Sequence, residues 1–145
     1  MTHVAFHFNA PDRVAYACRL LRKAVGSGAK LLVTGSPSLL SQLDAALWSF
    51  SPVDFVPHCN LGDDARVIAA SPVILSDSIH SSPHRQVLLN LDDWVPEGFE
   101  EFSRVIEIVG SNDVERQLAR SRWKFYADRG YSITRHDLAT ASSSS

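Results

Sequence analysis

Long apolar runs are missing from this 145-residue chain. No stretch approaches the roughly 20 apolar residues that a membrane-spanning helix needs. The opening segment MTHVAFHFNAPDR lacks a basic region followed by a long apolar run, so we expect no signal peptide. These absences favour a cytoplasmic protein that does not act at a membrane.

Cysteine is scarce as well, with two residues in the whole chain. Two cysteines are too few for a disulfide framework, which again favours a reducing, cytoplasmic setting. Cys18 lies within a helical pattern and is expected to be a small core residue, whereas Cys59 is expected in a loop.

A strong excess of either charge is also absent. The chain carries 14 Lys and Arg against 16 Asp and Glu, a formal net charge of -2, which argues against wrapping nucleic acid over the whole surface. With 45% hydrophobic residues the composition is that of a globular protein of one domain. We expect this domain over residues 1–138, followed by a disordered Ser-rich tail, ATASSSS, at 139–145.

The glycine-rich turns of nucleotide-binding folds are not present either. GSGAK at 26–30 leads from a helix into a strand, the reverse of a phosphate-binding loop, and TGSPS at 34–38 lacks the final glycine of a nucleophile elbow. His80 and His84 lie in a Ser/Pro-rich loop without further metal-ligand spacing. The sequence therefore predicts no catalytic residues, no metal and no cofactor.

What is present is an alternation of helical and strand patterns. Strand patterns are expected at 3–9, 30–35, 72–77, 86–93, 105–110 and, at an edge, 131–138. Helical patterns are expected at 11–28, 36–50, 98–104 and 111–130. This order predicts an α/β fold: a single three-layer, Rossmann-like domain with a mostly parallel central sheet flanked by helices.

The last of these helices concentrates positive charge. Residues 111–136 hold six Lys or Arg against three Asp or Glu. Arg116, Arg120 and Lys124 recur every four residues and so form one stripe, with Trp123 beside it. The stripe is either a solvated face or a binding surface, and the aromatic residue favours binding. An acidic peptide with an apolar end would suit it.

Four stretches resemble one known family over about residues 3–136. They are AYACRLLRKAVGSGAKLLV at 15–33, LDAALWSFSPVDFVPH at 43–58, VLLNL at 87–91 and RQLARSRWKFYADRGY at 116–131. Together they are similar to the chi subunit of bacterial DNA polymerase III, part of the clamp-loader assembly. Trp123 stands where the family often has tyrosine.

The resemblance implies a non-catalytic accessory subunit involved in DNA replication. Such a subunit binds the acidic, phenylalanine-ending tail of single-stranded DNA-binding protein and meets nucleic acid only indirectly. Through the psi subunit it reaches the clamp loader, and the psi-facing surface can also bind an XPD-like helicase. The residues implied for the tail are Val109, Arg116, Arg120, Trp123 and Lys124. Those implied for psi or the helicase are Trp48, Phe55 and Pro57.

Two other functions remain open from the residues alone. A small nucleotide-binding or hydrolytic α/β enzyme would need a glycine-rich turn or a clustered acid and base. A direct binder of single-stranded DNA would use the arginines on phosphates and stack bases on Trp123.

Overall fold

A computed structural model describes residues 2–49, 57–60, 71–77 and 84–138. The strands are β1 (His3–Ala10), β2 (Leu31–Thr34), β3 (His58–Asn60), β4 (Val73–Leu75), β5 (Val87–Asn90), β6 (Arg104–Gly110) and β7 (Ser132–Asp137). The helices are α1 (Arg13–Gly26), α2 (Pro37–Ser49) and α4 (Asp113–Asp128), with a 3-10 turn, η1 (Phe99–Glu101).

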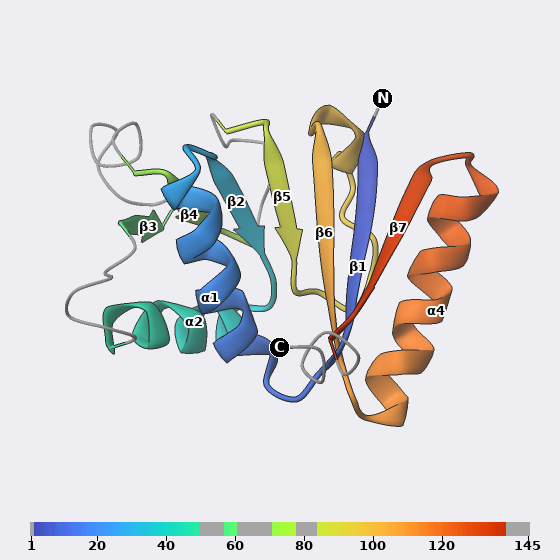
Figure 1. Ribbon diagram of the computed structural model, residues 1–145, viewed down its shortest axis with the longest axis horizontal. Helices are drawn as coiled ribbons and strands as arrows, with labels where there is room; N and C mark the ends of the chain where they lie inside the picture. Colours follow the sequence, from blue (N-terminus) through green and yellow to red (C-terminus); the bar gives the residue numbers. More distant parts are fainter. Residues whose placement is uncertain (1, 50–56, 61–70, 78–83, 139–145) are drawn as a thin grey trace.

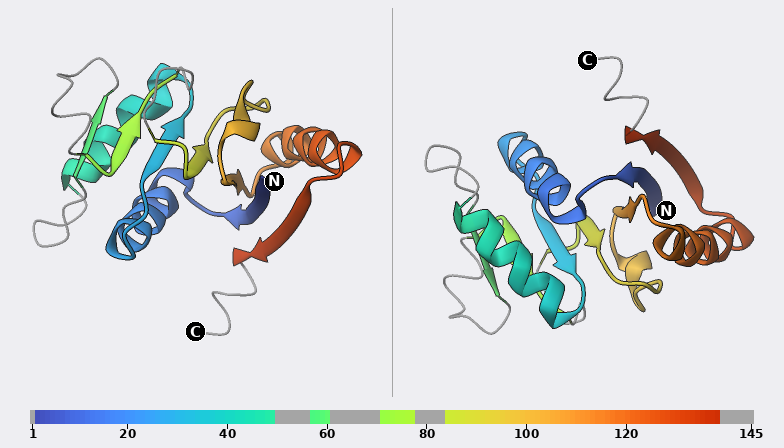
Figure 2. Two further views of the ribbon diagram at one scale, coloured as in Figure 1. Left: turned by 90° about the horizontal axis from the view of Figure 1, so that it is seen from above. Right: turned by 90° about the horizontal axis from the view of Figure 1, so that it is seen from below.

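The strands form one parallel sheet in the order β3-β4-β2-β5-β6-β1-β7. One buried cluster joins the sheet to α1 and α2, and a second joins it to η1 and α4. Figures 1 and 2 show α1 and α4 on opposite sides of the sheet. This confirms the predicted three-layer α/β domain, and the expected edge strand is β7, parallel to its neighbour β1.

Polar side chains determine where the helices begin. Asp12 accepts a hydrogen bond from the backbone N–H of Ala15, and Asn112 accepts one from that of Glu115. Ser36 does the same for Leu39 at the start of α2. Each cap satisfies a backbone donor that the first helical turn leaves without an intrahelical acceptor.

Two sequence-based predictions were wrong in detail. The helix expected at 98–104 is the short turn η1, because extended backbone at Phe102 ends it and buries both Phe99 and Phe102. Cys59, expected in a loop, is a buried residue of β3. Phe55 and the tail at 139–145 lie outside the described residues.

A buried polar cluster attaches α4 to the sheet. Glu107 of β6 is fully buried; its Oε1 is 3.0 Å from Arg122 Nε, and its Oε2 accepts a 2.8 Å bond from the Tyr126 hydroxyl. The Asn90 amide donates to both carboxylate oxygens. Burial raises the pKa of Glu107, and the Arg122 guanidinium opposes that shift. Every oxygen of this buried carboxylate is therefore hydrogen-bonded.

The side chains that bury α4 include a charged one. Ala119, Arg122 and Tyr126 are the buried residues of the helix, whereas the apolar Leu118 and Phe125 are only partly buried. The polar cluster explains the difference, because Glu107 draws Arg122 and Tyr126, one turn apart, toward the sheet.

A histidine on the other face of the sheet is held neutral. His7 shares a hydrogen bond with the Tyr16 hydroxyl, and its ring centroid lies 4.5 Å from that of His136. Burial, then the charges of His136 and Arg104, lower the pKa of His7 from 6.5 to about 4.

The first prediction concerns the buried ion pair. Arg122→Met leaves the Glu107 carboxylate buried and unpaired, so we expect the free energy of unfolding to fall by about 3–5 kcal/mol. Lys124→Met is the matched control, since it removes an exposed pair with Asp128 and should cost less than about 1 kcal/mol. Urea denaturation followed by circular dichroism measures both, and equal losses would contradict the role of the cluster.

The second prediction concerns pH. The unfolded chain protonates His7 near pH 6.5, but the folded chain only near pH 4. The unfolded state therefore binds more protons between these values, and stability should fall as the pH drops from 6.5 to 4. His7→Gln should flatten this part of the stability profile, whereas His3→Gln should leave it unchanged. An unchanged slope in His7→Gln would show that another group causes the loss.

Candidate functional site

Strand parity brings three apolar side chains to one face of the sheet. Phe6 and Phe8 are two apart on β1, and Val109 lies on the neighbouring strand β6. Alternate residues of a strand point to the same side, so these three side chains face α4. In the parallel register Arg135 of β7 pairs with Phe6, which places Arg135 on that same side.

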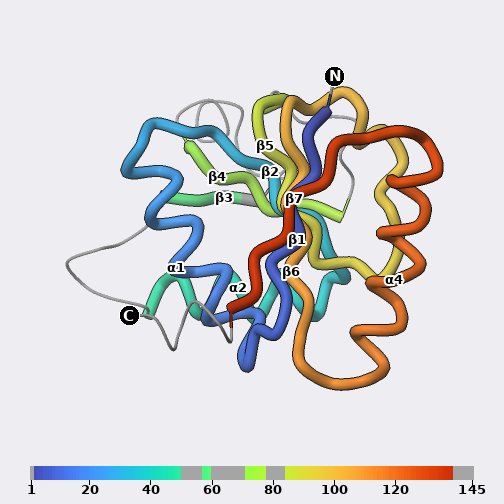
Figure 3. Tube along the Cα trace, turned by 45° about the vertical axis from the view of Figure 1, so that its right-hand side comes forward, coloured from blue at the N-terminus to red at the C-terminus, as the bar shows by residue number. Residues whose placement is uncertain are grey.

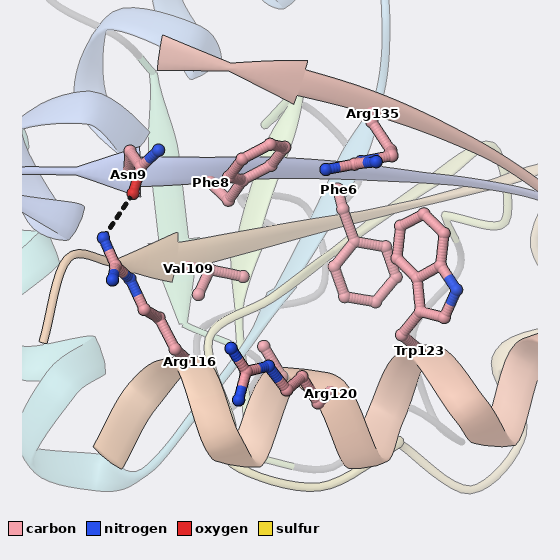
Figure 4. Close-up of a pocket in the computed structure, with 9 residues that line it drawn as sticks. Phe6, Phe8, Asn9, Val109, Arg116, Arg120, Trp123 and Arg135 are labelled. Atoms are coloured by element: carbon pink, nitrogen blue, oxygen red, sulfur yellow. Dashed lines mark hydrogen bonds between the residues drawn. The ribbon is translucent and has the colours of Figure 1, made fainter. Parts of the chain in front are cut away.

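A cavity of about 520 Å³ opens between these strands and α4. Figure 3 shows α4 and β7 diverging from the turn that joins them, and Figure 4 shows the residues that line the cavity. Its lining residues are Phe6, Phe8, Asn9, Val109, Arg116, Ala119, Arg120, Trp123 and Arg135. The interior is therefore mostly apolar, and three arginines stand at its edge.

Trp123 forms one wall of the cavity. Its ring centroid lies 5.0 Å from that of Phe6, and the side chain is half-buried against the α4-facing cluster. The Arg135 guanidinium carbon lies 5.8 Å from the centroid of the Trp123 ring and 5.2 Å from that of Phe8. The aromatic residue next to the cationic stripe thus belongs to a formed cavity rather than to an isolated exposed patch.

Asn9 links α4 to β7 at one end of the cavity. Its φ of 64° lies in the left-handed region, which asparagine tolerates better than most residues. Its Oδ1 accepts a 2.9 Å hydrogen bond from Arg116, and its Nδ2 donates a 2.9 Å bond to Asp137 of β7. Figure 4 shows the first of these bonds. Arg116 is thereby held at the N-terminal end of α4, where the helix dipole adds positive potential.

The arginines at this cavity lack close carboxylate partners in the described part of the chain. Arg116 is 4.0 Å from the exposed Asp113, while Arg120 and Arg135 have no ion pair there. By contrast, Arg13 pairs with Glu115 at 3.1 Å and Arg122 with Glu107. The cavity rim therefore offers guanidinium donors to an anionic ligand.

Lys124 does not line the cavity. Its side chain is 78% exposed, and its ammonium group lies 3.4 Å from Asp128 one turn further along. Of the five residues implied for the tail, the structure thus brings Val109, Arg116, Arg120 and Trp123 together and leaves Lys124 beside them.

The second implied surface lies at the end of α2. Trp48 is 65% exposed, and its ring centroid lies 5.6 Å from that of His58, which follows the exposed Pro57. His58 is held by a 2.8 Å contact between its Nε2 and Asp44 Oδ1. The Trp48 ring is therefore exposed to solvent and packs against the His58 ring. Phe55 lies outside the described residues.

Five cavity residues were missed in the sequence. They are Phe6, Phe8, Asn9, Ala119 and Arg135. The alternation in HVAFHFN placed both phenylalanines on one face, which was a usable signal. Arg135 could not be assigned, because the position of the edge strand depends on which strand it pairs with.

A second hollow lies where nucleotides bind in many related folds. The helices after β1 and β6 lie on opposite faces, so the crevice at the carboxyl ends of these neighbouring strands is a topological switch point. Here the side chain of Arg13 crosses it, donating to the Leu91 carbonyl at 2.7 Å and pairing with Glu115. The carboxylates of Asp12 and Glu115 make this crevice a poor site for phosphate.

No group of three or more His, Cys, Asp or Glu in the described ranges is placed to hold a metal ion. No helix in that part of the chain has both the length and the apolar character to cross a bilayer.

Fold and site together define a small parallel α/β domain with an arginine-rimmed apolar cavity beside its last helix. The family model described as DNA polymerase III chi subunit, HolC, matches residues 1–134. The chain therefore belongs to the DNA polymerase III chi subunit family.

Curated relatives agree with this assignment. The DNA polymerase III subunit chi of Pseudomonas aeruginosa is 35% identical over 95% of this chain and 98% of that protein. The subunits chi of Haemophilus influenzae and Escherichia coli are 28% and 29% identical, over 84% and 80% of this chain and 85% and 79% of those proteins.

Proposed function

We propose that this chain is a non-catalytic accessory subunit of the DNA polymerase III holoenzyme. Its cavity binds the acidic C-terminal tail of single-stranded DNA-binding protein, and its Trp48 surface binds the psi subunit of the clamp loader. The observation that carries the first part is the cavity itself, apolar inside and rimmed by three arginines.

The chemistry of the cavity matches the two properties of such a tail. A terminal phenylalanine would place its ring against Phe6, Val109 and Trp123, where aromatic contacts add to the burial of apolar surface. The aspartates that precede it would meet Arg116 and Arg120, which are four residues apart on α4. The whole chain carries a net charge of -2, so attraction comes from this local rim rather than from the overall charge.

A single contact of this kind should be modest in strength. A disordered tail loses conformational entropy when it binds, so we expect a dissociation constant of about micromolar. Several tails on one oligomeric partner would raise the effective concentration at the cavity. The subunit would then stay attached to DNA covered by single-stranded DNA-binding protein, although each single tail dissociates readily.

The Trp48 surface supports the second part of the proposal. Trp48 is exposed at the end of α2. Tryptophan is enriched among the residues that dominate the binding energy of protein interfaces. Trp48 lies on α2, whereas the cavity lies between α4 and β7 on the other side of the sheet. Separate surfaces allow one subunit to bind a tail and psi together, and an XPD-like helicase would compete with psi for the same surface.

The third prediction tests the tail. A labelled acidic peptide ending in Pro-Phe should bind saturably in fluorescence anisotropy, and Arg120→Ala should weaken it about tenfold because a charge-assisted hydrogen bond is lost. Arg19→Ala is the matched control, since it removes an exposed arginine from α1 and should leave affinity unchanged.

Two further arms identify the ligand. A peptide without the final Phe should bind far more weakly, and labelled oligothymidine should not bind at the same salt concentration. Absence of peptide binding at low salt would overturn the tail-binding function. Tight, steeply salt-dependent binding of oligothymidine alone would instead favour a direct single-strand binder.

The fourth prediction tests the psi surface. Trp48→Ala should weaken binding of purified psi about 30-fold or more, as expected of a dominant interface residue, and should leave the tail affinity unchanged. Trp94→Ala is the matched control, because Trp94 is the other large aromatic residue with an exposed side chain in the described residues. Isothermal titration calorimetry measures both, and equal affinities in the two variants would remove Trp48 from the interface.

A further inference from the structure

Arg135 occupies an unusual place among the cavity arginines. It comes from the edge strand β7, whereas Arg116 and Arg120 come from α4. Its side chain is exposed, yet its guanidinium group is held over the rings of Phe8 and Trp123 at 5.2 and 5.8 Å. Figure 4 shows it extending from β7 over the cavity toward Phe8. Arg135 therefore lies where the apolar interior meets solvent.

Within the described residues, the contacts of Arg135 are with aromatic rings and leave its hydrogen-bond donors unused. A guanidinium that lies against aromatic rings keeps its N–H groups available at its edge. In the described residues, Arg135 makes cation–π contacts but no hydrogen bond or ion pair. Aromatic contacts also restrict the side chain before any ligand arrives, so less entropy is lost on binding an anion.

The chemistry of a chain end restricts which arginine can bind it. In a C-terminal residue the α-carboxylate is attached to the same carbon as the side chain, so a buried ring keeps the carboxylate within a few ångströms of the cavity mouth. Arg116 lies at the other end of the cavity and is held there by Asn9. Arg135 contacts the aromatic wall directly and is placed to reach both the ring and the carboxylate beside it.

We propose that Arg135 binds the terminal α-carboxylate of the ligand, and that Arg120 and Arg116 bind carboxylates of the preceding side chains. This inference rests on the proposed function of the cavity. Arg135 thereby makes the cavity specific for a chain end, because an internal acidic segment carries no α-carboxylate next to its apolar residue. The specificity for a chain end is then separate from the general attraction of an acidic peptide.

The fifth prediction is a double-mutant cycle between Arg135 and the peptide terminus. The two peptides are identical and end in Pro-Phe, one with a free carboxylate and one with a C-terminal amide. Arg135→Gln should weaken binding of the free-acid peptide about tenfold and that of the amide peptide less than about twofold. Arg120→Gln is the matched variant, and it should weaken both peptides by a similar factor.

The outcomes distinguish a failure of this inference from a failure of the proposed function. If wild-type protein fails to bind the free-acid peptide, the proposed function itself is wrong. If wild type binds but Arg135→Gln weakens both peptides equally, or neither, Arg135 does not recognise the carboxylate and only this inference is overturned. Thermal unfolding of each variant confirms that the exposed position tolerates glutamine, and a loss confined to the free-acid peptide in Arg120→Gln would assign the carboxylate to Arg120 instead.

Discussion

The orientation of α4 depends on one buried carboxylate. Glu107 accepts hydrogen bonds from Arg122, Tyr126 and Asn90, which come from α4 and a neighbouring strand. A carboxylate enclosed in the core must be paired, so the helix cannot rotate about its axis without breaking these bonds. With Arg122 and Tyr126 turned toward β6, the neighbouring residues Arg116, Arg120 and Trp123 are directed toward the cavity. The cavity wall on α4 is therefore positioned by buried contacts of Glu107, which does not line the cavity.

The cluster also explains why cations of the same helix have different roles. Arg122 is neutralised by Glu107 in the core, and Lys124 lies close to Asp128 at the surface. Arg120 has no carboxylate partner in the described residues and faces the cavity. Positive charge in the sequence therefore overstates the charge that a ligand would meet, and the number of unpaired guanidiniums at the cavity is the better guide. Glu107 has a raised pKa, yet its complete burial away from the cavity indicates a structural role rather than an acid or base.

The sequence was sufficient for the architecture but only partly for the site. Alternating strand and helix patterns predicted the order of the elements, because such patterns are local signals. The stripe of α4 was predicted for the same reason. The burial of Arg122 was not, because the partner that makes it tolerable lies 15 positions away on β6. Arg135 was missed since an edge strand reveals neither its neighbour nor its register, and both decide which side chains share a cavity.

The position of the cavity follows from what occupies the crevice at the switch point. Folds of this kind usually bind ligands between the carboxyl ends of the two strands whose helices leave on opposite faces. In this chain Arg13 and Glu115 form an ion pair there, and Gly110 leaves room for it, since a Cβ at that residue would lie 1.5 Å from a Glu115 oxygen. The same ion pair links the first turns of α1 and α4 across the sheet. Strand β7 pairs with β1 at the edge of the sheet and forms one wall of the cavity. The cavity therefore lies one strand away from the switch point, on the side of the sheet covered by α4. The ion pair in the switch-point crevice and the lateral cavity are thus two consequences of how α4 is attached, and a ligand of this fold would find open space beside β7 rather than at the switch point.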